Sequence, residues 1–171
     1  MERINLKFNY EIEFIDLFCE FLETKNIEYK RELNPGFPYH KAKIDIVIRE
    51  NNHLIGIEAK IKDFEAVYLQ ALGNRVFTPY NSVLFPSKPS EEKLNELKRN
   101  RIGLYIYDSK LNTFICLLPS IKSEWTIRNY YNKLKKNWNL NKCGRLFNKS
   151  ELPENYELKD MYSKNWNKIN L

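Results

Sequence analysis

The sequence predicts an α/β fold in which a mixed β-sheet is flanked by helices. Three observations indicate this. Residues 43–60 alternate apolar and polar side chains on either side of Asn51-Asn52, as a β-hairpin does. Residues 14–22 repeat apolar side chains at steps of three and four, as one face of a helix does. Further short apolar runs and helical stretches then alternate along the chain.

The expected order is a helix, three strands, a helix, a strand, a helix and two strands. Polar residues that favour helix N-caps precede the three helices: Asn9, Asp63 and Ser90. We expect helices at 10–25, 64–77 and 91–100, and strands at 27–33, 43–49, 54–60, 81–86, 102–108 and 113–119.

Charge divides the 171-residue chain into two parts, a core of residues 1–119 and a basic, aromatic-rich extension of residues 120–171. The extension carries 11 Lys/Arg against 5 Asp/Glu and all three tryptophans, whereas the core is balanced. We expect a helix from Ser123 with an apolar stripe that includes Leu134 and Trp138, and a short helix near 158–166. A basic segment rich in aromatic residues suits contact with a polyanion, and it equally suits a solvated helix that packs on the core.

Several classes of protein are disfavoured by the sequence. No apolar run approaches the roughly 20 residues that span a bilayer, and the first residues do not resemble a signal peptide. Three widely spaced cysteines form no zinc-binding pattern and favour a reducing, cytoplasmic location. Glycine-rich nucleotide-binding motifs are missing.

The hairpin at 43–60 carries the residues that suggest chemistry. With a turn at Asn51-Asn52, residues whose numbers sum to 103 face each other, so Asp45 lies opposite Glu58. Lys43 then lies opposite Lys60, which shares a face with both acids. The isoleucines and Ala59 form the other, core-facing surface, and Gly56 keeps the polar face low enough for another group to approach.

Two opposed carboxylates have Cβ atoms roughly 4.5–5.5 Å apart and repel unless a cation or a shared proton lies between them. Hard oxygen ligands favour Mg²⁺ or Mn²⁺, and Lys60 could then orient a metal-bound water. The alternative is an ordinary solvated hairpin face on which Lys60 bridges the acids. Asp in a strand, opposite a like charge, favours the functional interpretation.

The pattern Asp45-x12-Glu58-Ala59-Lys60 on a hairpin, behind a helix and before a helix with Gln70, resembles the PD-(D/E)XK nuclease superfamily. The similarity covers about residues 11–86 and implies a restriction-endonuclease-like fold. One difference is that Ile44, not proline, precedes Asp45.

The resemblance implies a Mg²⁺-dependent DNA endonuclease, with Mn²⁺ as a substitute metal. Asp45, Glu58 and the Ala59 carbonyl would bind the metal, Lys60 would position the attacking water, and Gln70 would orient groups. A glutamate of the first helix often completes such sites, and Glu13 is our first choice, ahead of Glu11 and Glu20.

DNA contacts are expected from basic residues near the hairpin and on the basic helix, although solvated positions are equally compatible with them: Lys43, Lys62, Arg75, Arg128, Lys133, Lys135 and Lys136. The resemblance further implies a homodimer, because small nucleases of this fold commonly dimerise to cut two strands. Two alternatives remain open. One is a non-catalytic nucleic-acid-binding or interaction module that retains the fold, and the other is a nuclease subunit that is active only in a larger complex.

Overall fold

A computed structural model describes residues 8–36 and 43–140, which form six strands and four helices. The predicted order of elements is confirmed over this part of the chain. The expected helix near 158–166 lies outside the described residues. The elements are α1 (Glu11–Thr24), β1 (Glu28–Leu33), β2 (Ile44–Glu50), β3 (His53–Ala59), α2 (Phe64–Asn74), β4 (Tyr80–Phe85), α3 (Glu91–Arg99), β5 (Ile102–Asp108), β6 (Thr113–Leu118) and α4 (Arg128–Leu140).

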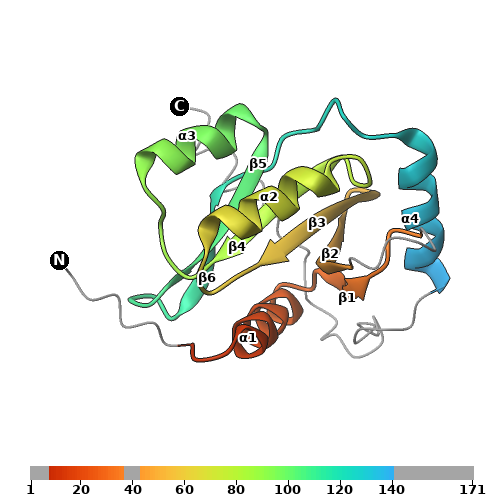
Figure 1. The fold of residues 1–171 in the computed structure, drawn as a ribbon. Coiled ribbons are helices and arrows are strands. Elements are labelled where there is room, and N and C mark those ends of the chain that lie inside the picture. Colours follow the sequence, from red (N-terminus) through yellow and green to blue (C-terminus); the bar gives the residue numbers. More distant parts are fainter. Residues whose placement is uncertain (1–7, 37–42, 141–171) are drawn as a thin grey trace.

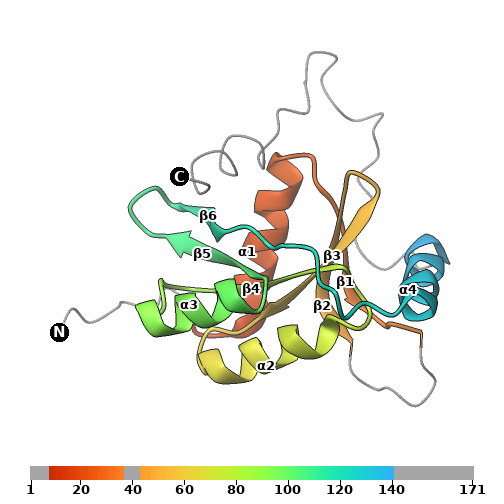
Figure 2. The same cartoon turned by 90° about the horizontal axis from the view of Figure 1, so that it is seen from above.

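The strands form one mixed sheet in chain order, from β1 to β6. β3 pairs with β4 and β4 with β5 in parallel, because α2 and α3 return the chain to the same end of the sheet. The remaining neighbours are antiparallel. Helix α1 covers one face, α2 and α3 cover the other, and α4 lies beside the end formed by β1 and β2 (Figures 1 and 2).

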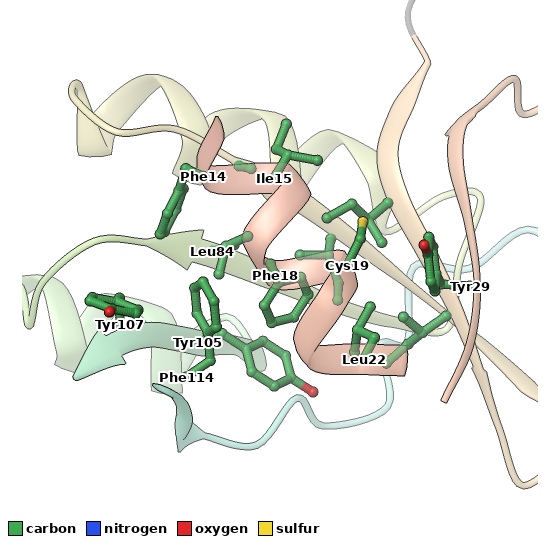
Figure 3. Packing of buried hydrophobic residues seen from close by; sticks show 14 of the residues in the cluster. Phe14, Ile15, Phe18, Cys19, Leu22, Tyr29, Leu84, Tyr105, Tyr107 and Phe114 are labelled. Atoms are coloured by element: carbon green, nitrogen blue, oxygen red, sulfur yellow. The ribbon is translucent and has the colours of Figure 1, made fainter. Parts of the chain in front are cut away.

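The face under α1 holds a large aromatic and aliphatic core. Phe14 and Phe18 of α1 are fully buried and lie near Tyr105 and Phe114 of the two last strands (Figure 3). The hairpin contributes Ile46, Ile48, Ile55, Ile57 and Ala59 to the same cluster. The helical stripe in the first third of the chain therefore identified the face of α1 that is buried.

The hairpin register agrees with the predicted one, since Ile46 faces Ile57 and Glu50 faces His53. The predicted pattern is wrong at Ile44, which packs with the cluster under α4 and not with the core under α1. The second face of the hairpin is also less polar than expected. Val47 and Leu54 are buried there against Leu134 and Trp138 of α4.

The ends of the helices differ from the expectations in part. Asp63 and Ser90 cap α2 and α3 as predicted, because their side chains accept backbone N–H groups three residues ahead. The N-cap of α1 is Tyr10 and not Asn9, and α2 ends at Asn74. Helix α4 starts at Arg128 and not near Ser123 as expected, and residues 119–127 form a connection without helix or strand.

Candidate active site at the open end of the β2–β3 hairpin

Asp45 and Glu58 lie next to each other where β2 begins and β3 ends. Each follows directly on the last pair of the hairpin register, Ile46–Ile57, and the two carboxyl groups interact directly. Asp45 Oδ2 accepts a hydrogen bond of 2.9 Å from the backbone N–H of Ala59. This contact turns the Asp45 carboxylate across the hairpin, towards the strand that carries Glu58.

Glu58 is a buried acid, with 4% of its surface exposed. Burial raises the pKa of Glu58 far above that of a free glutamate, and the neighbouring Asp45 carboxylate raises it further. A hydrogen bond from Asn74 and the charge of Lys60 act in the opposite direction. The two carboxyl groups are therefore held so close that, without a cation, the neutral form of Glu58 is favoured.

Lys60 follows directly on β3 and connects this acid pair to α1. Its Nζ lies 2.9 Å from Glu11 Oε1, and both side chains are about one-third exposed. Burial acts to lower the pKa of Lys60, but the Glu11 hydrogen bond and the charges of Glu11, Asp45 and Glu58 outweigh it and raise the pKa. The ammonium group is therefore held in its charged form, and its partial exposure leaves it accessible from outside.

Asn74, the last residue of α2, holds the other side of Glu58. Its side-chain amide donates a hydrogen bond of 2.5 Å to Glu58 Oε1. The Asn74 carbonyl in turn accepts from the hydroxyl of Thr78, and Thr78 also bonds to the side chain of Asn81. Thr78 and Asn81 are buried, so the hydrogen bonds among Asn74, Thr78 and Asn81 fix the end of α2 over β3.

Gly56 is part of the same arrangement. A Cβ at this position would lie 3.0 Å from Asn81 Oδ1 and 3.1 Å from Thr78 Oγ1. The expectation that Gly56 leaves space for an incoming group is wrong, because the side chains of Thr78, before β4, and Asn81, in β4, fill that space.

Asp45 and Glu58 fit a divalent cation that prefers oxygen ligands. Their mutual repulsion is what such an ion would relieve. Within residues 8–36 and 43–140, no group of three His, Cys, Asp or Glu side chains is arranged to bind a metal. A Mg²⁺ here would thus have two carboxylates from the protein and complete its shell with a backbone carbonyl such as that of Ala59 and with water, as Mg²⁺ commonly does.

Among the three candidate glutamates of α1, the structure brings Glu11 and not Glu13 to Lys60. Glu13, the first choice, accepts the backbone N–H groups of Asn9 and Tyr10 at 3.3 and 3.4 Å and so caps its own helix. Glu11 is the α1 acid that reaches Lys60. Glu20 is exposed further along the helix.

The other predicted site residues do not converge on the acid pair in the described contacts. Gln70 is exposed on α2, and Asn74, one turn later, is the residue of that helix that contacts Glu58. Sequence reasoning missed Asn74, although its spacing of four residues from Gln70 puts both on one helical face and could have pointed to it. Lys43 pairs with Glu32 at 3.7 Å, and Lys62 is exposed.

The basic candidates nearer the C-terminus lie elsewhere. Arg75 packs its guanidinium group on the ring of Trp125, 5.8 Å from the centroid. The four basic side chains of α4 are exposed: Arg128, Lys133, Lys135 and Lys136. No described helix is long and apolar enough to cross a membrane.

Comparisons with known proteins inform the fold alone. No protein-family description and no curated protein matches the chain. A solved structure, the SPO1766 protein of unknown function from Silicibacter pomeroyi, is similar with a TM-score of 0.56 at 14% sequence identity. The match covers 78% of this chain and 86% of that one. The protein thus has an α/β fold with a six-stranded mixed sheet flanked by helices, and its overall fold is similar to that of this neighbour.

Proposed function

We propose that this protein is a Mg²⁺-dependent DNA endonuclease with a restriction-endonuclease-like catalytic core. The observation that carries the proposal is the placement of Asp45 beside the buried Glu58, with Lys60 directly after the end of β3. A buried acid next to a second acid is destabilised as an anion, so such a pair is expected where a cation or proton has a role.

Each residue of the site has a distinct task in this proposal. Asp45 and Glu58, with the Ala59 carbonyl, would hold Mg²⁺, which when bound would polarise the scissile phosphodiester and acidify the attacking water. Lys60 orients that water and offsets charge on the phosphate. Glu11 fixes the Lys60 ammonium group, and Asn74 fixes the orientation of Glu58.

The basic helix α4 supports a nucleic-acid substrate. Its 13 residues include four Lys/Arg and no acid, and those four side chains are exposed. DNA remains our choice of substrate, cut by a homodimer or within a larger complex. A cytoplasmic location would suit each of these assemblies.

The proposal is tested by calorimetric titration of the wild type and Glu58→Gln with Mn²⁺ or Mg²⁺, followed by incubation with plasmid and branched DNA. Glu65→Gln, which changes an exposed acid on α2, is the matched control. Loss of metal binding and of DNA nicking in Glu58→Gln alone is the expected result. Metal binding without cleavage of any DNA would instead favour a subunit of a larger complex. Absence of metal binding in the wild type would refute the nuclease proposal.

A further inference from the structure

Trp125 is a large aromatic side chain that the fold leaves mostly in solvent. It lies in the connection between β6 and α4, and 67% of its surface is exposed. Two apolar neighbours in the same connection, Ile121 and Ile127, are also exposed, at 50% and 43%. A Trp is normally well buried in a soluble protein, so this group of exposed apolar residues calls for an explanation.

The backbone around Trp125 is fixed to the end of α2. Figure 1 shows residues 119–127 running from β6 past this end of α2 to the start of α4. The N–H of Ser123 donates to Pro79 O at 2.7 Å, and the N–H of Ile127 donates to Val76 O at 3.0 Å. Between them, the hydroxyl of Thr126 donates to Arg75 O at 3.0 Å. The backbone that carries the indole is therefore held in place by hydrogen bonds on both sides of Trp125.

Arg75 and Trp125 form one composite surface. The guanidinium group lies over the indole ring and donates through Nε to Leu72 O at 3.0 Å, so its plane is also held by α2. Proteins that bind single strands combine such groups: the aromatic ring stacks on the face of a nucleobase, and the neighbouring cation attracts the phosphate of the strand.

The charge around this surface favours a polyanion over an acidic or neutral protein. Arg128 begins α4 directly after the connection, and that helix carries basic side chains without an acid. The one acid of the connection, Glu124, is paired with Arg101 at 3.0 Å. Positive charge therefore predominates in the connection and α4, where Lys122 and Arg128 lie on either side of Trp125 in the sequence.

We propose that Trp125 and Arg75 form a stacking platform for an unpaired nucleobase of a bound nucleic-acid strand. The platform is close to the candidate active site along the chain, because Arg75 directly follows Asn74, which holds Glu58. The inference rests on the proposed function in naming DNA as the substrate. It concerns binding and not cleavage, so it is tested without metal.

The experiment measures the fluorescence anisotropy of a labelled single-stranded oligonucleotide with the full chain, in EDTA and at one fixed salt concentration. Trp125→Ala is compared with Trp125→Phe, which keeps a ring face. Leu111→Ala is the control, because Leu111 is similarly exposed, at 66%, but lies in the turn between β5 and β6. A second oligonucleotide of the same length, with abasic sites throughout its centre, retains the phosphates without the bases.

Trp125→Ala is expected to weaken binding of the normal strand roughly 5- to 150-fold, the range typical for loss of one stacked base. Trp125→Phe should recover most of this, Leu111→Ala should bind like the wild type, and the loss should vanish on the abasic strand. An equal loss on both strands, or no loss on either, would overturn the platform. A slightly lower melting temperature of Trp125→Ala is expected from the lost contact with Arg75, and the abasic strand separates that effect from loss of base stacking.

The outcomes separate this inference from the proposed function. Base-dependent binding through Trp125 in a protein that cuts no DNA would support the platform and refute the nuclease. If the wild type cuts DNA with metal, and Trp125→Ala changes neither cleavage nor oligonucleotide binding, the nuclease would be supported and the platform refuted. Failure of the wild type to bind either oligonucleotide at low salt would refute the platform and leave a protein partner for this surface.

Discussion

The side-chain amide of Asn74 donates a 2.5 Å hydrogen bond to Glu58 Oε1, which joins the last residue of α2 to the buried acid of β3. The contact spans 16 residues of chain and depends on how the helix is placed on the sheet. It stabilises the ionised form of an acid that burial and Asp45 both drive towards the neutral form. Asn74 is thus a positioning residue of the proposed metal site.

Asn74→Ala is expected to weaken Mn²⁺ binding roughly 10- to 100-fold, the usual loss when a residue that orients a metal ligand is removed. Without the amide, the pKa of Glu58 rises further and a proton competes more strongly with the metal. Calorimetric titration at two pH values measures this, and the deficit should shrink at the higher pH. Asn95→Ala, on the exposed side of α3, is the control for loss of an amide.

The variants Gln70→Ala and Asn74→Ala compare two residues of α2. The family resemblance implies a role for Gln70, whereas the structure brings Asn74 to Glu58. Because Gln70 is exposed and Asn74 contacts the acid, Asn74→Ala should lose more DNA cleavage than Gln70→Ala. Initial rates of plasmid nicking under saturating metal give the comparison. A larger loss in Gln70→Ala would return the orienting role to Gln70.

Glu11 and Glu13 provide a matched pair, because both are acids in the first turn of α1. Either alanine variant loses the favourable interaction with the helix dipole, worth about 0.3–1 kcal/mol. Glu13→Ala also loses the cap on Asn9 and Tyr10, so it should be the less stable of the two in urea unfolding. Glu11→Ala should lose more cleavage activity, since it frees Lys60. Equal activity of the two variants would contradict a role for Glu11 in the site.

The pH dependence of stability reports on Glu58. The folded protein retains a proton on Glu58 that the unfolded chain releases above a pKa of about 4.3, so the free energy of unfolding should fall as pH rises towards the raised pKa. Below the unfolded pKa this contribution is constant. Urea unfolding in EDTA from pH 5 to 9 measures the slope, and Glu58→Gln should be flatter than the wild type. Parallel curves for the two proteins would show that the acid is not perturbed.

Gly56→Ala tests the contact between β3 and the side chains of Thr78 and Asn81. The added methyl group would press on Asn81 and Thr78, and the variant should lose about 1–3 kcal/mol of stability. Gly73→Ala is the control, because a Cβ there meets nothing within 4 Å and a helical alanine should add about 0.5–1 kcal/mol. Thermal or urea unfolding should show a lower free energy of unfolding for Gly56→Ala and a higher one for Gly73→Ala. A neutral Gly56→Ala would mean that Asn81 and Thr78 move aside easily.

Local sequence determined the secondary structure and the hairpin. The alternation of residues 43–60 and the Asn51-Asn52 turn specify a register through neighbouring residues only, and the structure has that register. Both asparagines have positive φ angles, 46° and 65°, as a tight hairpin turn requires. The register from Ile46–Ile57 to Glu50–His53 therefore followed from sequence alone.

Tertiary structure decided which other residues meet this acid pair. A helical pattern shows which face is buried, but the sliding and rotation of the helix on the sheet decide which polar residue at its edge reaches a given strand. Glu11 in place of Glu13, and Asn74 beside Glu58, both depend on that docking. The burial of Glu58, which shifts its pKa, depends on it as well, because burial is contributed by elements distant in the chain.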